Sequence, residues 1–282
     1  MTNEEKGAVV AVVTAWERTR YMGEAVSSVL AGHLLPDTIL LVSDFDPGPF
    51  CPPAPRGGRP EMRWVGVGSP DQGPKVAAAV RESPPGSLLA FLDDDDLWER
   101  RKLALVIQPF LKDPSVSLVN HAHVEFSDGP GRPPRRPLWK IVRDLRGGRT
   151  RLAGVDYYGN ASSMVVRREA LVPHLALIER FGLAIDDALF WLGLAAGRVV
   201  SDPTALTRIR IHGSNSSRRE DGGGRRALTE RRFATYEALS ELLADDREAG
   251  GPVPPDFLRR YAFIRRERDL ARERAAYAVT RP

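Results

Sequence analysis

The sequence predicts an α/β fold in which helices flank a mostly parallel central sheet, with a small helical extension at the C-terminus. An apolar, β-branched run from Ala8 to Val13 is typical of a strand buried on both faces. A helical pattern and a second apolar run follow it, and this β-α-β opening indicates two parallel strands joined by a right-handed crossover. The 282 residues, 42% of them hydrophobic, can bury a full core in one large domain, with or without a small appendage.

The first crossover helix is predicted by apolar residues that recur at helical spacing and end before Gly32. These residues are Met22, Ala25, Val26, Val29 and Leu30. The second strand covers Ile39 to Val42 and leads into Asp44 and Asp46. The region from Phe45 to Arg63 is rich in proline and glycine, which indicates an irregular surface connection.

A short edge strand is predicted over Arg63–Val67, and a helix over Val76–Arg81 follows it. Pro74 suits the first turn of that helix, and Lys75 comes directly after it. A helix N-terminus is also an anion-binding site in its own right. The next apolar run, Leu88–Leu92, is bounded upstream by proline and glycine and predicts another buried strand.

Four consecutive aspartates, Asp93 to Asp96, follow this buried strand directly. They would place carboxylates at the carboxyl edge of the sheet, where open α/β sheets bind ligands. Carboxylates packed so closely repel one another, and a hard divalent cation such as Mg2+ or Mn2+ would relieve that repulsion. The tetrad therefore predicts a metal–diphosphate site, with a solvated charge run as the alternative.

The last aspartate of the tetrad has a structural interpretation. Asp96 followed by Glu99 indicates the N-cap and the acidic first turn of a helix. The buried face of that helix is predicted by Leu103, Val106, Ile107, Phe110 and Leu111. A capping role for Asp96 leaves Asp93 and Asp95 as a D-x-D pair with no structural need for charge.

The stretch Ala90–Trp98 resembles the metal-binding segment of inverting family 2 glycosyltransferases of the GT-A fold, which commonly reads F-L-D-x-D-D-x-W. The resemblance implies a GT-A type fold and a metal-dependent transferase. It further implies that Asp93 and Asp95 bind Mn2+ or Mg2+, and that Asp93 and Asp94 contact a nucleotide-sugar donor.

The nucleotide-binding segments of that family are altered in this chain. The family's first strand usually ends in P-T-Y-N-R and its second in V-D-D-G-S, where this chain has Thr14–Arg18 and Val42–Asp46. By register, the resemblance implies that Thr14 lies beside the base and that Asp44 accepts a hydrogen bond from a uracil N–H. Asp46 is the substitute if the register slips by two, and an aspartate in an ordinary turn is the alternative for Asp44.

The family also has a basic residue near the diphosphate, in a segment that reads N-x-G-x-x-x-A-R-N. Lys75 is its counterpart here, and a solvated lysine on a surface helix is the alternative. A UDP-sugar is the default donor of the family. Because the loop around Asp44 is altered, guanosine and thymidine diphosphate stay open.

Past the tetrad, Leu118–Phe126 predicts a further strand, with His121 and His123 on one face. This spacing can ligate a metal, but we favour a pair that decorates the solvated side of the strand. The strongly basic stretch Gly129–Arg151 predicts a mobile loop over the acceptor side. Its arginines would meet an anionic acceptor, a phospholipid surface, or only solvent.

Two segments resemble the acceptor side of the family. Asn160–Leu171 resembles a strand-to-helix segment, which implies that Ser163 faces the sugar and the acceptor. Ile185–Leu192 resembles the helix start E-D-x-x-x-W-L, and implies that Asp186 contacts the donor and Asp187 is the general base. Inversion at an anomeric carbon requires such a carboxylate opposite the departing nucleotide. The alternative is a pair at a helix N-cap and first turn.

The closing segment Arg208–Ser217 resembles R-x-H-x-x-N-x-S, which implies that His212 is a third metal ligand. An ordinary loop histidine is the alternative. After a break at Gly222–Gly224, the tail predicts polar-faced helices with a buried stripe of Phe233, Tyr236, Leu239, Leu242 and Leu243. The stretch Arg259–Tyr277 predicts a helix with i,i+4 ion pairs, which packs on the main domain or mediates homodimerisation.

The resemblance covers roughly Ala8–Ser217 and implies a non-processive inverting glycosyltransferase that moves a sugar from a nucleoside diphosphate to an acceptor hydroxyl. Residues 1–128 would form the nucleotide-sugar-binding half of the GT-A domain, 129–218 its acceptor-binding half, and 219–282 a helical extension. A catalytically silent, nucleotide-binding GT-A protein stays open as one alternative. A sugar nucleotidyltransferase is the other, although Thr14–Arg20 lacks the glycine-rich phosphate loop that such enzymes usually have.

Composition agrees with these expectations. The formal net charge of +4, from 41 basic and 37 acidic residues, fits an anionic ligand but is too mild to demand nucleic acid. The single cysteine, Cys51, excludes an internal disulfide and suits a reducing compartment. Met1–Gly7 is polar and lacks a signal-peptide core, and no apolar stretch approaches the length of a membrane span. We therefore expect a cytoplasmic protein, with any membrane contact peripheral.

Overall fold

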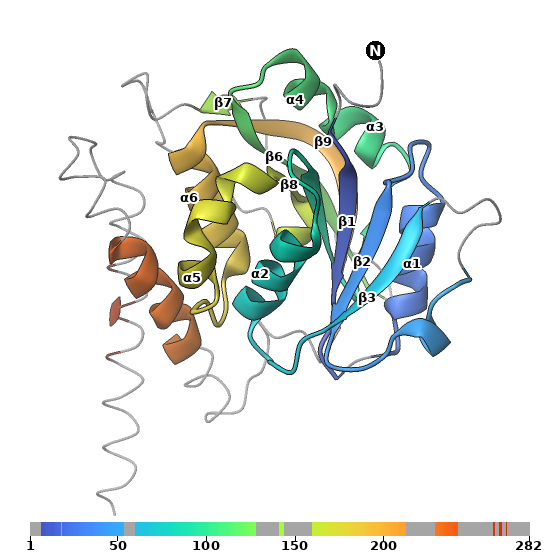
Figure 1. Ribbon diagram of the computed structural model, residues 1–282, viewed down its shortest axis with the longest axis horizontal. Coiled ribbons are helices and arrows are strands. Elements are labelled where there is room, and N and C mark those ends of the chain that lie inside the picture. Colours follow the sequence, from blue (N-terminus) through green and yellow to red (C-terminus); the bar gives the residue numbers. More distant parts are fainter. Residues whose placement is uncertain are drawn as a thin grey trace, which may run out of the picture.

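The computed structural model describes residues 7–17, 19–53, 60–127, 160–212 and 229–241, the backbone of 141–143, and positions 262, 265, 266 and 269. These residues build one mixed sheet with helices on both faces (Figure 1). The predicted α/β fold with flanking helices is therefore confirmed.

Four strands form the parallel half of the sheet, in the spatial order β3-β2-β1-β4. They are β1 Val9–Thr14, β2 Thr38–Ser43, β3 Glu61–Gly66 and β4 Leu88–Asp93. Helix α1 (Met22–Leu30) connects β1 to β2, and helix α2 (Gln72–Glu82) connects β3 to β4. The predicted β-α-β opening and the edge strand are thus confirmed, and Thr14 pairs in register with Asp93 at the carboxyl edge.

The other half of the sheet is mixed. Its strands are β5 Leu97–Trp98, β6 Val116–Phe126, β7 Ile141–Arg143, β8 Met164–Arg167 and β9 Arg198–Arg210. Strand β8 pairs antiparallel with β4 and β6, whereas β6 runs parallel to β9. Strands β5 and β7 pair antiparallel with β9. Six of the nine strands in the described part of the chain therefore run in one direction.

The long strand β9 is absent from the strands that the sequence predicts. It contains Pro203, which has no N–H for a ladder hydrogen bond and argues against a strand. Its pairing with β6 also shifts register between Asp202 and Ala205, so the ladder is interrupted there. The apolar alternation that identifies a strand is therefore broken in the middle of this one.

The remaining helical segments lie mostly between the strands of the second half. They are η1 Gly48–Phe50, α3 Lys102–Val106, α4 Gln108–Lys112, η2 Ala161–Ser163, η3 Arg168–Ala170, η4 Val172–His174, α5 Leu175–Ile178 and α6 Ile185–Ala196. Apart from these, a helix over residues 229–241 packs against the domain beside α5 and α6 (Figure 1).

Two apolar layers cover the two faces of the sheet. Helices α2, α5 and α6 pack on one face, together with Val10 and Val12 of β1. Helices α1, α3 and α4 pack on the other, together with Val9, Ala11 and Val13. Successive residues of β1 thus alternate between two buried layers, which explains why this strand is apolar throughout.

The predicted capping role of Asp96 is wrong. Strand β5 follows Asp96 directly, and α3 begins only at Lys102, with Arg101 at its N-cap. The apolar face predicted for one helix is divided between the short helices α3 and α4, because Pro109 starts a new helical turn. Asp96 is instead free to take part in the site at the sheet edge.

The interpretation of His121 as a solvated residue is also wrong. Its side chain is buried, and its Nδ1 donates to the carbonyl of Ala122 at 2.8 Å. The β6–β9 ladder shifts register on both sides of Ala122, so the alternation expected for an uninterrupted strand does not hold there. Burial lowers the pKa of His121 well below its ordinary value, so its imidazole is neutral.

The helix over residues 229–241 buries Phe233, Tyr236 and Leu239, as the predicted stripe requires. Leu242 and Leu243 lie outside the described residues, as do the side chains of the basic stretch 129–151 and most of the C-terminal tail. Within the described part of the chain, none of the helices has the length and apolar character that crossing a membrane requires.

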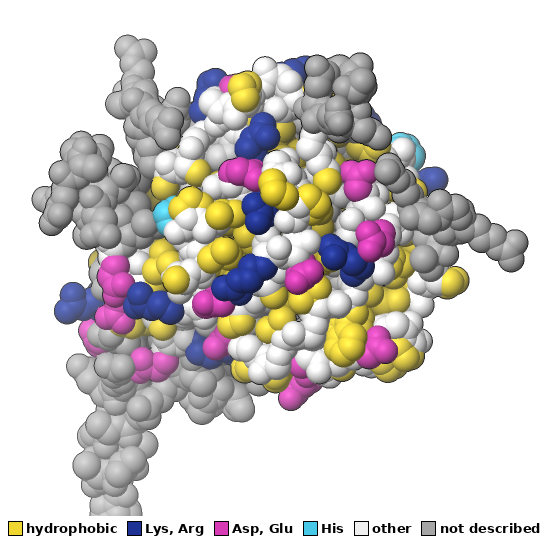
Figure 2. All heavy atoms as spheres, viewed as in Figure 1, with side chains coloured by type: hydrophobic (Ala, Val, Ile, Leu, Met, Phe, Trp, Pro, Cys, Tyr) yellow, Lys and Arg dark blue, Asp and Glu magenta, His cyan; other side chains and the backbone are white. Residues whose placement is uncertain are grey.

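Charged side chains of both signs are interspersed on the face shown in Figure 2. Exposed ion pairs join Arg81 to Glu179 at 2.6 Å and Arg180 to Glu241 at 2.9 Å. Exposed pairs of this kind contribute only about 0–1 kcal/mol each. The pair at Glu241 nevertheless shows that the helix over 229–241 lies against the segment that follows α5.

Candidate active site

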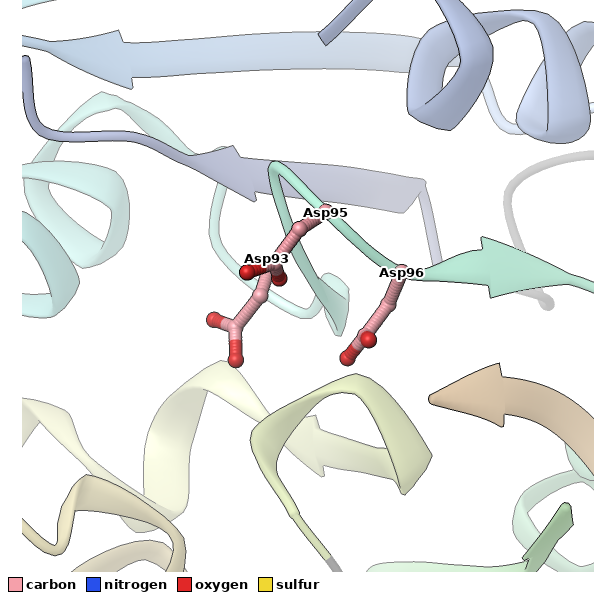
Figure 3. Close-up of side chains that lie close together, drawn as sticks. All are labelled: Asp93, Asp95 and Asp96. Atoms are coloured by element: carbon pink, nitrogen blue, oxygen red, sulfur yellow. The ribbon is translucent and has the colours of Figure 1, made fainter. Parts of the chain in front are cut away.

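Three carboxylates converge where β4 ends. Oxygens of Asp93, Asp95 and Asp96 all lie within 4.8 Å of one another (Figure 3). The neighbouring strand β1 supports this turn: Thr14 Oγ1 donates to Asp93 Oδ1 at 3.2 Å, and the Thr14 carbonyl accepts from the N–H of Asp94 at 3.1 Å. The predicted residues Thr14, Asp93 and Asp94 are therefore adjacent.

The chain after β9 returns to this cluster and brings His212 against Asp95. The Nε2 of His212 lies 3.0 Å from Asp95 Oδ2. Arg210 fixes the approach, since its Nε donates to the Asp95 carbonyl at 3.1 Å and its guanidinium pairs with Glu24 at 2.6 Å. Of the three predicted metal ligands, Asp93 and Asp95 thus lie in one cluster, and His212 contacts Asp95.

Asp96 is held by the surrounding protein. Its Oδ2 accepts from Asn160 Nδ2 at 2.9 Å and from Ser162 Oγ at 2.6 Å, and its Oδ1 accepts from the N–H of Arg210 at 2.9 Å. These bonds tie the end of β4 to η2 and β9, so Asp96 is a structural member of the cluster. Burial, followed by the charges of Asp93 and Asp95, raises the pKa of Asp96 well above its ordinary value.

Lys102 lies beside the cluster, and no pattern in the sequence assigned it a role. Its side chain is 1% exposed, and Nζ donates to the Ser162 carbonyl at 2.5 Å and lies 4.1 Å from the Trp98 ring centroid. Burial lowers the pKa of Lys102 well below its ordinary value, an effect that Asp96 opposes. The one available signal was its position one turn before Val106, at the margin of an apolar face.

Ser163 is fully buried in η2. Its hydroxyl donates to Asn160 Oδ1 at 3.0 Å, and Asn160 in turn donates to Asp96. Asn160 and Ser162 contact the acidic cluster directly, through Asp96. Sequence reasoning did not assign these two contacts. Ser163 is therefore linked to the acidic cluster through one intervening side chain.

The strand end expected to hold the base carries Asp44. Its Oδ1 accepts from the N–H of Glu17 at 3.0 Å, and Glu17 has a left-handed backbone with φ of 52°. Asp44 thus joins the loop after β1 to the end of β2. Its proposed substitute, Asp46, accepts from the N–H of Gly48 at 2.8 Å and so closes a local turn.

The alternative of a solvated Lys75 is wrong, because the side chain is 3% exposed. Its Nζ lies 5.1 Å from the Trp16 ring centroid. Among the described residues it makes no hydrogen bond, although Asp44, Asp93 and Asp94 are near enough for their charges to act on it. Burial outweighs these charges and lowers the pKa of Lys75 to about 8.

The second acidic pair begins α6. Ala184 is the N-cap residue and has a left-handed backbone, so the predicted N-cap role of Asp186 or Asp187 is wrong, whereas both do occupy the first turn. Asp187 is 6% exposed, and its Oδ2 accepts a hydrogen bond from the Tyr236 hydroxyl at 2.7 Å. Burial and then the charge of Asp186 raise the pKa of Asp187 to about 8.

The segment η2 contacts the elements that carry both acidic sets. It packs against β4, which ends at the tetrad, and against α6, which begins with the second pair. Asp186 is half-buried, and burial is the main cause that raises its pKa. The described residues therefore hold a cluster of three carboxylates at the end of β4 and, at the start of α6, a carboxylate whose pKa is raised to about 8.

Comparison with known proteins identifies the fold. No family model matches this sequence, and no curated protein matches it in sequence. Among solved structures, the chain is similar to residues 1–349 of TarS from S. aureus, with a TM-score of 0.55 and 13% identity over 84% of this chain and 70% of that chain. The same TarS segment in complex with UDP-GlcNAc gives a TM-score of 0.55.

A second neighbour is GalNAc-T7 with UDP, GalNAc and Mn2+, with a TM-score of 0.52 and 11% identity. That match covers 74% of this chain and 44% of GalNAc-T7. Both neighbours are glycosyltransferases, and at such low identity the likeness establishes the fold alone. The chain has the GT-A glycosyltransferase fold that the sequence predicted.

Proposed function

We propose that this protein is a non-processive inverting glycosyltransferase, similar to family 2, that moves a sugar from a nucleoside diphosphate to an acceptor hydroxyl. One observation carries the proposal. On a GT-A fold, Asp93 and Asp95 cluster near Thr14 and Lys75, with His212 against Asp95, and η2 links this strand end to α6, which carries the buried Asp187. A donor diphosphate needs groups that offset its negative charge, and an acceptor hydroxyl needs a base that takes its proton.

The donor is proposed to be a UDP-sugar. TarS is known in complex with UDP-GlcNAc and with UDP, and GalNAc-T7 with UDP, GalNAc and Mn2+, which supports this choice. Thr14 and Asp44 would contact the nucleoside, and Asp93, Asp94 and Asp186 the donor sugar and phosphate groups. Because Asp44 already accepts from Glu17, its remaining acceptor capacity is what a uracil N–H would use.

The residues present fit a divalent cation. Carboxylate oxygens and an imidazole nitrogen are ligands of Mn2+ and Mg2+. Here Asp93 and Asp95 lie in one cluster, and His212 supplies an imidazole nitrogen beside Asp95. The carboxylate of Asp96 is already engaged by three donors, so it supports the ligands. When bound, such a cation offsets the negative charge of a diphosphate leaving group.

The protein's own groups perform the transfer. Asp187 takes the proton from the acceptor hydroxyl while that oxygen attacks the anomeric carbon of the donor. The bond from this carbon to the diphosphate oxygen breaks, its electron pair leaves with the diphosphate, and the configuration inverts. A pKa of about 8 makes Asp187 a stronger base than an ordinary carboxylate, and Lys75 stabilises the departing diphosphate.

The assignment to family 2 is supported by the motif Ala90–Trp98 and by the order of the later segments along the chain. The division at residues 128 and 218 is likewise proposed. Both boundaries lie outside the described residues. The contacts among the described residues do not identify the acceptor.

A donor screen tests this function. The protein would be incubated with UDP-GlcNAc, other UDP-sugars, and GDP- and dTDP-sugars, with Mn2+ or with EDTA, and both Tm and released nucleotide measured. We expect a Mn2+-dependent rise in Tm with UDP, since a ligand that binds only the folded state stabilises it, and Mn2+-dependent release from at least one donor.

Two results of the screen would overturn the proposal. If none of the nucleotides raises Tm with Mn2+, the donor site is wrong. If UDP binds but no donor is turned over with a range of hydroxyl acceptors, the protein is a silent nucleotide-binding member of the fold. The altered segment Thr14–Arg18 is the observation that favours this second candidate.

A further inference from the structure

The helix over residues 229–241 contacts the predicted base directly. The hydroxyl of Tyr236 donates to Asp187 Oδ2 at 2.7 Å, and both side chains are buried. The two residues are 49 positions apart, so this contact exists only because the helix folds back onto the start of α6.

The same helix also holds the loop that precedes α6. Thr235 Oγ1 donates to the Leu183 carbonyl at 2.6 Å, and Arg231 donates to the Gly182 carbonyl at 3.3 Å. Arg231 further joins Asp71, the N-cap residue of α2, at 2.8 Å. Ala184, between this loop and α6, has the left-handed φ of 62°, a conformation that persists in a non-glycine residue only when its surroundings fix it.

We propose that Tyr236 is a positioning residue for Asp187, and that the helix over residues 229–241 is therefore part of the catalytic centre. This inference rests on the proposed role of Asp187 as general base. Packing alone does not require the hydroxyl, because Tyr236 lies in an apolar layer with Phe233 and Leu239 where a phenylalanine would fill the same space. The hydroxyl fixes one oxygen of the carboxylate and so orients the other.

The charged groups around Asp187 give the direction of the effect. Asp186, on the same helix, raises the pKa of Asp187, whereas Arg232 and the Tyr236 hydroxyl, both from the helix over 229–241, lower it. A donated hydrogen bond favours the ionised carboxylate, which is the form that accepts a proton. Tyr236 therefore both orients the base and keeps it available at lower pH.

The test is Tyr236→Phe, read first without any substrate. Protein labelled with 13C at aspartate carboxyl groups would be titrated by NMR, with the Asp187 signal assigned by its loss in Asp187→Asn. We expect the pKa of Asp187 to rise by about one unit in Tyr236→Phe, as the loss of a hydrogen bond to a charged group implies. The acidic limb of the pH profile for UDP release from UDP-GlcNAc should move by the same amount.

The matched control is Phe233→Leu, which removes packing from the same helix and leaves the hydroxyl in place. It should lower Tm without moving the Asp187 titration. Incorporation of 3-fluorotyrosine, a more acidic phenol and a stronger donor, gives a second test that barely alters packing. The pKa of Asp187 should then fall in the wild type and stay unchanged in Tyr236→Phe carrying the same label.

The outcomes separate this inference from the proposed function. An Asp187 titration that is unchanged in Tyr236→Phe and with 3-fluorotyrosine overturns the positioning role, and the general base stands if Asp187→Asn is inactive. Wild-type turnover by Asp187→Asn overturns the base itself, whatever the NMR titration shows. A shift in Phe233→Leu as large as that in Tyr236→Phe would mean that packing, and not the hydroxyl, controls Asp187.

Discussion

The two acidic sets of this protein are built from the same residue type but are held by different partners. The tetrad at the end of β4 meets Thr14, Asn160, Ser162, Arg210 and His212. At the start of α6, the Tyr236 hydroxyl donates to Asp187, whose pKa is raised to about 8 by burial and by Asp186. Burial raises the pKa of Asp96 as well, so what sets the first group apart is a cluster of three carboxylates with a histidine beside it.

Under the proposed function, this difference separates two roles. Clustered carboxylate oxygens beside a histidine suit a divalent cation and, through it, a diphosphate. A buried carboxylate with a raised pKa can accept a proton from a hydroxyl at near-neutral pH. A change confined to one of these roles should leave the other unaffected.

Replacement of the proposed base should have the largest effect. Asp187→Asn keeps the size of the side chain but removes the proton acceptor, so turnover of the active donor should fall about 10²- to 10⁴-fold. Affinity for UDP with Mn2+ should stay within about twofold, because Asp187 is proposed to act on the acceptor hydroxyl and not on the nucleotide. Asp202→Asn is the control, because that carboxylate accepts from the N–H of Thr204 in a local turn. Equal turnover in both variants would contradict the assignment.

The buried lysine should matter for the donor and not for the base. Lys75→Met retains most of the packing on Trp16 and removes the charge, so the Kd for UDP with Mn2+ should rise about 10- to 100-fold. Isothermal titration calorimetry measures this change. Lys112→Met, an exposed change on α4, is the matched control and should leave Kd unchanged. An unaltered Kd in Lys75→Met would remove Lys75 from the diphosphate site.

Asp96, the structural member of the tetrad, should affect the stability of the protein, whereas Asp93 and Asp95 should affect metal binding. Asp96→Asn places an amide among Asn160, Ser162 and the N–H of Arg210, and a buried donor then loses its acceptor. We expect a loss of about 1–3 kcal/mol in the free energy of unfolding. Chemical denaturation monitors it. A variant as stable as the wild type would show that these hydrogen bonds do not support the cluster.

The smallest effect is a pH-dependent change in stability. The pKa of Asp187 is raised to about 8, so the folded protein keeps a proton that the unfolded chain releases above about pH 4. The stabilising contribution of that proton is present below about pH 4 and is lost as pH rises through about 8. Asp187→Asn does not undergo this loss. The Tm of the variant minus the Tm of the wild type should therefore increase by about 3 °C between pH 6 and pH 9. Parallel Tm curves would contradict the raised pKa.

The parts of the molecule that sequence could predict are those encoded by neighbouring residues. The strand Leu88–Leu92 and the tetrad are contiguous, so their place at the carboxyl edge follows from local pattern. The parallel half is likewise built from short-range apolar runs. The mixed half was harder, because Pro203 and the register shifts around Ala122 break the alternation on which strand prediction depends.

Many of the hydrogen bonds that hold the site residues could not be predicted, because the two residues that form each bond are distant in sequence. Arg210 lies 115 positions from Asp95, and Tyr236 lies 49 from Asp187. Tyr236 was expected only as a member of a buried helical stripe, and Lys102 had no predicted role. Their polar atoms acquire a role only when the fold brings them against carboxylates from other elements.

The central claim is that the acidic cluster binds the metal and the donor, whereas Asp187 acts only as the base. It is tested by calorimetric titration of UDP into wild type, Asp95→Asn and Asp187→Asn, each with Mn2+ and with EDTA. The account predicts Mn2+-dependent binding in wild type and Asp187→Asn, and its loss by about 100-fold in Asp95→Asn, the upper range for a metal-site change. Equal binding by all three proteins, or binding that is indifferent to Mn2+, would contradict it.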